Sequence, residues 1–404
     1  MIDIILMACL GVVGGTITGL IPGVHPNTVS AILLASTASL LLFFTPHAIA
    51  VFITSMAISN TFLNFIPSVF IGAPEGETAL SVLPGHRFLL KGQAQEAICL
   101  TVAGGLGVIV LSIVLFPLVS FTLPILYMGI KSFMAWLLLA IAGVMILLDD
   151  GHKRLYGLLI FGLSGILGIM TLNTPLLPDQ NLLFPIFTGL FGISTLIISI
   201  GSGISVPVQN TSPVRLPGKE TLLGTVKGFF SGMLMGVLPG IGAAQAGVLS
   251  HELSRGKCIK EFMVSLGGIN TVAALFSLMA LYLISRPRSG AAIAVQEVLM
   301  NFGFGEMLLL MATALFSAGL GAFLTIKMGR WFAGLFQRLD YNKVSVAIIV
   351  MLVGMVVVLT GAMGMLYMLT ATAIGMLPPL LGVKRTHCMG FLMLPIMIFY
   401  FGMM

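Results

Sequence analysis

Two copies of one glycine-rich stretch decide the fold: Gly11-Val-Val-Gly-Gly-Thr-Ile-Thr-Gly-Leu-Ile-Pro-Gly23 returns as Gly228-Phe-Phe-Ser-Gly-Met-Leu-Met-Gly-Val-Leu-Pro-Gly240. The glycines at every fourth position and the final Pro-Gly pair are matched at a constant offset of 217 residues. Glycine at that spacing lets a second helix approach closely. Pro-Gly interrupts a helix, because proline removes a hydrogen bond and glycine frees the backbone. The two copies predict an internal repeat whose halves each begin with a broken helix.

The composition indicates that these helices lie in a lipid bilayer. The 404 residues are 58% hydrophobic and only 8% charged, whereas a soluble domain is about 25% charged. This excludes a water-soluble enzyme and a disordered chain. The net charge of +6 does not indicate nucleic acid, because the basic residues lie in short gaps between apolar runs. The four cysteines include no CxxC pair, so neither a disulfide framework nor a zinc site is predicted.

Apolar runs of about 20 residues are long enough to cross a bilayer. They predict ten crossings, at 48–71, 98–122, 133–148, 155–172, 184–206, 262–285, 306–326, 344–361, 364–381 and 388–404. Two more apolar segments, 4–44 and 221–250, are broken by Pro-Gly and are interpreted as hairpins that enter and leave on the same side. Two full crossings would return the chain to the same side equally well, so segment 4–44 stays open between these forms.

The basic residues predict the orientation. With the N-terminus outside, 16 of the 19 fall on inner segments, and the outer segments hold only Lys131, Arg286 and Arg288. This agrees with the positive-inside rule. The first basic residue is Arg87, so no cleavable signal peptide is expected. The prediction is a multi-pass protein of the plasma membrane.

The expected fold is an all-α polytopic membrane protein with two inverted repeats. Each repeat contains a Pro-Gly-broken hairpin and about five transmembrane helices, and this odd number inverts the second copy. The boundaries are 1–206 for the first repeat, 207–220 for a cytoplasmic linker and 221–404 for the second. Secondary transporters recurrently use this design, with the site near the midplane where the repeats meet.

The hairpin tips are therefore the candidate substrate or ion site. Backbone N–H groups after each break favour an anion, whereas carbonyls before it favour a cation. The imidazole of His25 binds substrate, carries a proton or only holds its loop. The plainer alternative is that the glycine stripes only pack helices. The tip residues assigned to the site are Gly23, His25, Asn27 and Thr28 in the first copy, and Gly240, Gly242 and Gln245 in the second.

Polar residues within apolar runs extend this site. Ser59-Asn60-Thr61 is weakly echoed by Ile269-Asn270-Thr271, and such side chains either line a site or join helices by hydrogen bonds. We add Asn60, Thr61, Asn270 and Thr271 to the binding residues. Four charged residues are candidates for coupling or gating, the alternative being solvated turns: Glu75, Glu77, Arg286 and Arg288.

Catalytic and nucleotide-binding motifs are missing from the sequence. It contains no His-Glu-x-x-His, Gly-x-Ser-x-Gly or Gly-x4-Gly-Lys-Ser/Thr. We expect no enzyme activity, no catalytic residue, no metal site and no cofactor other than Na⁺ or H⁺ as a coupling ion.

At Gly15–Gly23 and Gly232–Gly240 the sequence resembles the TctA family, the large membrane subunit of tripartite tricarboxylate transporters. Phe184-Pro-Ile-Phe-Thr-Gly-Leu-Phe-Gly-Ile-Ser194 is similar to a third family element. The resemblance implies an ion-coupled transporter of organic anions that works with a small membrane subunit and a periplasmic binding protein. Here the first loop reads Pro-Gly-Val-His-Pro-Asn in place of Pro-Gly-x-Gly, and the chain is short. It thus resembles a compact archaeal branch, for which we do not expect the binding protein.

We therefore predict a permease that moves a di- or tricarboxylate by alternating access. The alternative is a translocase of a lipid-linked phosphate such as polyprenyl phosphate, because a helix-tip anion site also suits that headgroup. A structural or receptor-like subunit and an intramembrane enzyme are further alternatives. The expected partners are membrane lipid, the anionic substrate, and a small membrane subunit or a second copy of the chain, but not nucleic acid.

Overall fold

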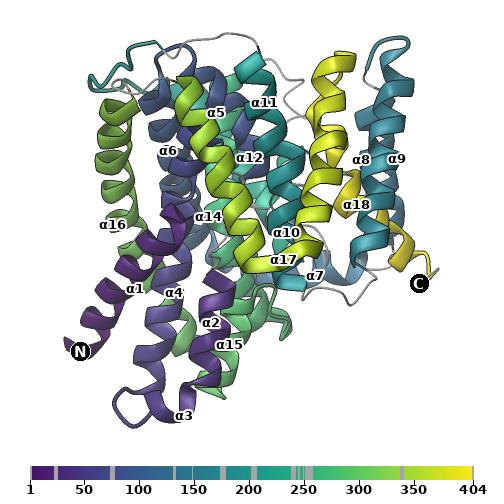
Figure 1. Cartoon of the computed structure of the whole chain (residues 1–404). Coiled ribbons are helices and arrows are strands. Elements are labelled where there is room, and N and C mark those ends of the chain that lie inside the picture. Colours follow the sequence, from purple (N-terminus) through teal and green to yellow (C-terminus); the bar gives the residue numbers. More distant parts are fainter. Residues whose placement is uncertain are drawn as a thin grey trace.

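The computed structural model describes residues 2–21, 26–72, 78–130, 133–147, 149–172, 179–201, 207–237, 243, 246–248, 250, 258–336 and 341–402. Every regular element in these ranges is a helix, which confirms the predicted all-α class. Figure 1 shows these helices standing roughly side by side.

The described helices are as follows. The first half contains α1 (Ile2–Leu20), α2 (Pro26–Ala35), α3 (Thr37–Leu40), α4 (Pro46–Leu63), η1 (Pro67–Ile71), η2 (Ala79–Ser81), α5 (Val82–Leu89), α6 (Ala94–Val114), α7 (Phe116–Ile130), α8 (Met134–Leu147), α9 (Lys153–Leu172), α10 (Asp179–Phe187), η4 (Thr188–Ile193) and α11 (Ser194–Gly201). The second contains α12 (Gly218–Val237), α14 (Ile259–Ile284), α15 (Gly290–Leu299), α16 (Phe304–Phe336), α17 (Tyr341–Leu381), η5 (Arg385–Met389) and α18 (Gly390–Tyr400). Of these, η1 and η4 are π-helices, whereas η2 and η5 are 3₁₀-helices.

Seven described helices are long and apolar enough to cross a membrane, and shorter apolar helices accompany them. The predicted crossings 344–361 and 364–381 form the two arms of α17, which turns at Gly361 (φ 65°, ψ −157°), a conformation that only glycine adopts readily. The predicted crossing 98–122 is wrong at its C-terminal end. There α6 ends at Val114 and α7 begins at Phe116, because Pro117 favours the first turn of a new helix.

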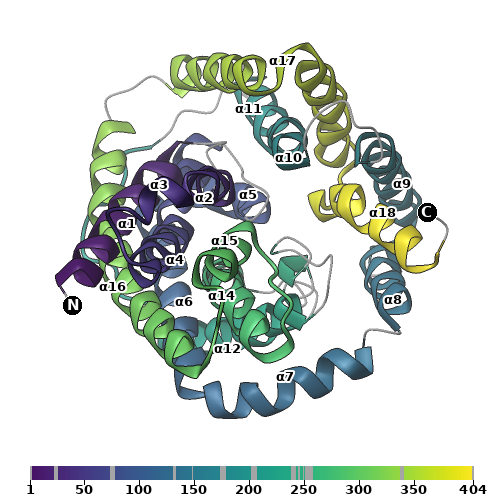
Figure 2. The ribbon, with the colours of Figure 1, turned by 90° about the horizontal axis from the view of Figure 1, so that it is seen from below.

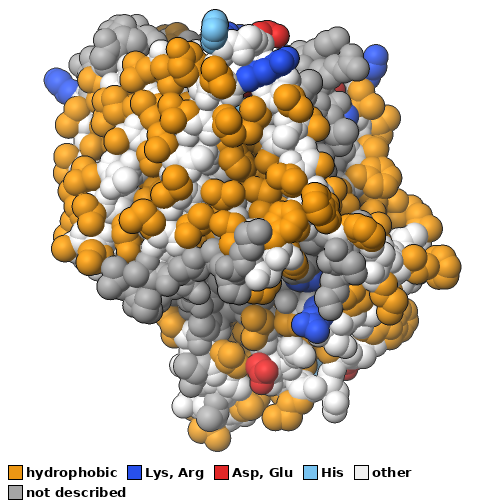
Figure 3. All heavy atoms as spheres, turned by 90° about the vertical axis from the view of Figure 1, so that its right-hand side faces the viewer, with side chains coloured by type: hydrophobic (Ala, Val, Ile, Leu, Met, Phe, Trp, Pro, Cys, Tyr) orange, Lys and Arg blue, Asp and Glu red, His pale blue; other side chains and the backbone are white. Residues whose placement is uncertain are grey.

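The outer surface of the molecule is apolar, as a lipid-facing surface must be. Figure 3 shows one face covered largely by hydrophobic side chains, with charged ones gathered mainly toward the top. Large exposed side chains on the helices of this part of the molecule include Trp136, Leu159 and Phe399. The apolar helices and this surface identify a multi-pass membrane protein.

The helices form two groups, which Figure 2 shows from one end. The first group contains α1–α6, α12 and α14–α16, and the second contains α8–α11, α17 and α18; α7 runs along the outside between them. In the second group, Nε2 of His387 lies 2.6 Å from Oδ2 of Asp149, and both side chains are buried. This pair joins the α8–α9 turn to η5.

The repeated glycines pack helices of the first group together. A Cβ on Gly15 of α1 would overlap the Ser59 hydroxyl of α4, and one on Gly232 of α12 would overlap the Val272 side chain of α14. Helix α6 then packs on α14, while α16 packs on α4. Each half of the chain thus contributes helices that lie against the other half.

The long helices α4–η1 and α14 terminate in the same way. A residue in the left-handed conformation follows each helix, Gly72 (φ 67°) and Ser285 (φ 52°). A serine pair then links the long helix to the short one that follows: Ser68 and Ser81 hydroxyls are 2.7 Å apart, and the Ser277 hydroxyl donates to Ser289 at 3.0 Å. The short helices α5 and α15 lie toward opposite ends of the molecule in Figure 1.

The packing of α1 on α4 gives a first prediction. Gly15→Ala forces Cβ into Ser59 and the α4 backbone, so we expect it to destabilise the protein by about 1–3 kcal/mol. Gly14→Ala is the matched control, since its Cβ would lie no closer than 3.5 Å to Phe52 and alanine favours a helix. Thermal unfolding of the purified variants checks this. Equal melting temperatures for the two variants would contradict the close packing.

Candidate functional site

Buried amides form a hydrogen-bonded cluster where α1, α4 and α14 meet. Nδ2 of Asn60 donates to the Thr18 hydroxyl at 3.1 Å. Nδ2 of Asn270 donates to Oδ1 of Asn64 and to the backbone oxygen of Thr61, both at 3.0 Å. These five residues, together with Thr271, are named the amide cluster below. The cluster joins the end of α1, just before the Pro-Gly break, to both long buried helices.

Two matching positions of the repeat touch within this cluster. The hydroxyls of Thr61 and Thr271, which are 210 residues apart, lie 3.2 Å from each other. Asn60 and Asn270 precede them in the sequence. The structure therefore brings together the four residues that the sequence places inside apolar runs.

One amide oxygen of the cluster has no hydrogen-bond partner among the described residues. Every member is at most 4% exposed. Oδ1 of Asn270 is fully buried and accepts no hydrogen bond within the described part of the chain. An unsatisfied buried acceptor costs about 1–3 kcal/mol, so its presence needs a compensating partner. A cation or a hydrogen-bond donor would supply one.

Asn27 lies beside a different helix, α15. Its Oδ1 accepts from the backbone N–H of Ala291 at 3.1 Å, and Gly290 packs against its Cβ. This contact ties α2 to the first turn of α15, which follows the loop that carries Arg286 and Arg288. The Arg286 side chain is exposed, whereas the Arg288 guanidinium lies 5.7 Å from the centre of the Tyr127 ring.

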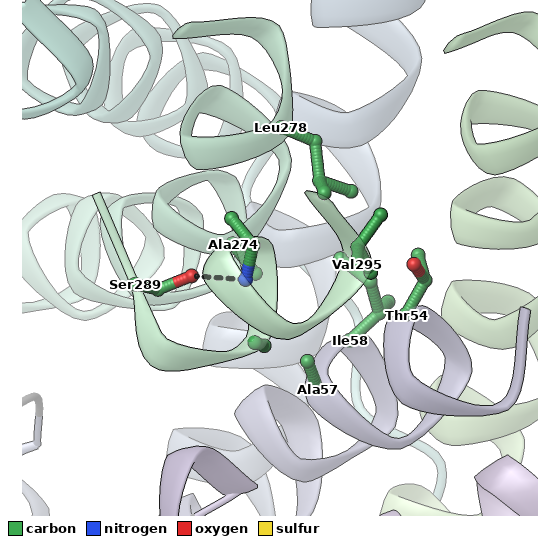
Figure 4. A pocket seen from close by; sticks show the side chains of 9 residues that line it. Thr54, Ala57, Ile58, Ala274, Leu278, Ser289 and Val295 are labelled. Atoms are coloured by element: carbon green, nitrogen blue, oxygen red, sulfur yellow. Dashed lines mark hydrogen bonds between the residues drawn. The ribbon is translucent and has the colours of Figure 1, made fainter. Parts of the chain in front are cut away.

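A small pocket lies next to this contact, between α4, α14 and α15 (Figure 4). Its walls are mainly apolar, and the Ser289 hydroxyl accepts from the N–H of Ala292 at its edge. The lining residues are Thr54, Ala57, Ile58, Ala274, Leu278, Ser289, Ala291, Ala292 and Val295. None of these residues is charged.

Several predicted site residues lie outside the described residues: Gly23, His25, Glu75, Glu77, Gly240, Gly242 and Gln245. Thr28 lies in α2, but its side chain is not described either. Among the described residues, no group of three or more His, Cys, Asp or Glu is placed to hold a metal ion.

Sequence reasoning missed Asn64 and Thr18. A signal for Asn64 was present, because it follows Asn60 by four residues and so lies on the same helix face. Thr18 lies between two of the repeated glycines, where threonine is unremarkable in a membrane helix. Only the packing of α1 on α4 shows that its hydroxyl accepts from Asn60.

An all-helical fold with many membrane-length helices and a polar cluster buried among them is typical of a membrane transporter. The chain matches the tripartite tricarboxylate transporter TctA family over residues 5–390 and belongs to that family. This agrees with the resemblance of its glycine-rich loops and with a transporter-type function.

Two relatives are also similar. An uncharacterized protein of Methanocaldococcus jannaschii, MJ1079, is 30% identical over 406 residues, which cover 98% of each chain. An uncharacterized 52.8 kDa protein of Agrobacterium vitis, from the TAR-I ttuC′ 3′ region, is 23% identical over 273 residues, or 62% of this chain and 53% of its own. No solved structure matches the chain.

The hydrogen bond between Asn64 and Asn270 gives a second prediction. We expect Asn64→Ala and Asn270→Ala to be non-additive, with a coupling free energy of about 0.6–1.7 kcal/mol, the range found for side-chain hydrogen bonds in membranes. Reversible unfolding of the single and double variants measures it. Asn64→Ala combined with Thr313→Val, on α16, is the control and should be additive. A coupling of zero in the amide pair would show that the bond adds nothing to stability.

Proposed function

We propose that the protein is an ion-coupled secondary transporter of a small organic anion, a di- or tricarboxylate, with its site at the two broken helices and the amide cluster. The supporting observation is Oδ1 of Asn270, which accepts no hydrogen bond among the described residues and is buried among the amides that link α1, α4 and α14. Membership of a tricarboxylate transporter family supports the class of cargo.

We further propose that the two halves are inverted repeats. The matching glycine contacts, the matching serine pairs and the opposite placement of α5 and α15 support this. For the first hairpin, Figure 1 shows the N-terminus and α3 both toward the lower end, as either a re-entrant segment or two full crossings would have them. Inversion would let the halves exchange shapes, which is the basis of alternating access.

The chemistry of the cluster favours Na⁺ over H⁺ as the coupling ion. Its described members are asparagines and threonines, which supply oxygen ligands but do not titrate in the physiological range. A hard cation prefers such oxygens, and the carbonyls of interrupted helices coordinate Na⁺ in other transporters. The tip carrying His25 is the competing proton site.

For the remaining assignments, we propose a plasma-membrane location with the N-terminus outside, supported by the distribution of the basic residues. A small membrane subunit or a second copy of the chain would be the partner, since the family is that of tripartite transporters.

Transport into liposomes tests this function. We expect purified protein to take up labelled citrate or succinate when a Na⁺ gradient is imposed, and Asn270→Ala to lower the initial rate at least about tenfold by removing one ligand. Thr370→Val is the control, because Thr370 is exposed on α17 and bonds only its own helix. Uptake driven equally by a proton gradient alone would contradict Na⁺ coupling.

Failure of uptake for every carboxylate and gradient would remove the carboxylate assignment. Translocation of a labelled polyprenyl phosphate between leaflets, measured in the same liposomes, would then favour the lipid-linked alternative. Asn270→Ala should lower that rate too if the same site is used.

A further inference from the structure

Arg385 is one of the few charged side chains that the structure buries. It begins η5, between α17 and α18, and is 8% exposed. Burial lowers the pKa of its guanidinium, which reflects the cost of removing the charge from water. A buried cation normally pairs with a carboxylate, because the desolvation cost is otherwise unrepaid.

The protein anchors this guanidinium with neutral oxygens. Nη1 donates to the hydroxyls of Thr195 at 2.5 Å and Ser194 at 3.0 Å, and more weakly to the backbone oxygen of Phe191 at 3.4 Å. Within the described ranges no carboxylate pairs with Arg385, and its Nε and Nη2 make no hydrogen bond. These two nitrogens form the edge of a guanidinium that binds a carboxylate or phosphate with two parallel bonds.

Among the described residues, no neighbouring side chain compensates the charge. His86 of α5 is buried near Arg385, and burial, together with the Arg385 charge, lowers its pKa to about 4. The imidazole is therefore neutral at pH 7. Arg385 bonds Phe191 of η4 and lies near His86 of α5. Since α5 packs on both η1 and η4, Arg385 lies where the first and second helix groups meet. Both η1 and η4 are π-helices, a form that is frequent at functional sites.

We propose that Arg385, anchored by Ser194 and Thr195, is an oxyanion-binding site at the contact between the two helix groups, with its Nε–Nη2 edge taking a carboxylate or phosphate group. The site is built from other helices than the amide cluster. Its ligand is the carboxylate of the transported acid or the phosphate of an anionic lipid. The first of these rests on the proposed function, so the test measures binding without transport.

Thermal unfolding of the full chain in neutral detergent tests the site. The probes are potassium citrate, succinate and phosphate at constant ionic strength, and, in a separate arm, phosphatidylglycerol against phosphatidylcholine. We expect at least one oxyanion to raise the melting temperature, and Arg385→Gln to raise its apparent Kd about tenfold or more. Arg385→Lys should also weaken binding, because an ammonium lacks the fork.

Arg87→Gln is the matched control, since Arg87 is the neighbour of His86 on α5 but is exposed. It should keep the response of the unsubstituted protein. If Arg385→Gln does not fold, Thr195→Val carries the test, because it loosens the anchor without removing the charge; a severalfold weaker response is expected.

The two arms distinguish the source of the oxyanion: a response to soluble acids points to the cargo, and a response to phosphatidylglycerol alone points to lipid. No response to any probe, or an unchanged response in the Arg385 and Thr195 variants, overturns the proposal. An oxyanion response that Arg385→Gln abolishes, in protein that shows no uptake in liposomes, would support this site and remove the transport function, so the two failures are separable.

Discussion

The direct approach of helix backbones within the first helix group is the constraint on which the rest of the structure depends. Where Gly15 and Gly232 meet α4 and α14, even one methyl group would not fit. At such short separations the short side chains of asparagine and threonine can reach a neighbouring helix, as Asn60 reaches Thr18. In lipid, where apolar surfaces gain little by touching, this packing and these hydrogen bonds hold the helices together. The same contacts stabilise the fold and assemble the amide cluster.

Scarcity of charge makes each buried ionic group informative. Asp149 and His387 are hydrogen-bonded to one another in the second helix group, so the fold accounts for both side chains. Arg385 is held by hydroxyls, and among the described residues its Nε–Nη2 edge makes no hydrogen bond. The amide cluster has the opposite character, with oxygen available and no charge. The structure thus has a neutral polar cluster in the first helix group and a buried guanidinium in the second.

Much of this architecture is predictable from sequence, because it is periodic. Apolar runs give the helices, and glycines at every fourth position give the packing of α1 on α4. The amides Asn60 and Asn270 are visible because they interrupt apolar runs. The partners of Asp149 and Arg385 cannot be predicted from the sequence. His387 and Ser194 lie about two hundred residues away from them along the chain, and no repeating pattern connects the positions. The end of α6 was misplaced because apolar composition does not report a helix boundary.

The contact between Thr61 and Thr271 has a consequence for what the site can distinguish. If one polypeptide had simply been paired with an identical copy, every group around such a contact would occur twice, and a ligand could bind in two equivalent poses. Here Asn64 is matched, at the same offset of 210 residues, by Ala274. One side of the junction therefore has an amide that the other lacks. At the proposed site, this loss of equivalence leaves a ligand one pose where an exact repeat would leave two.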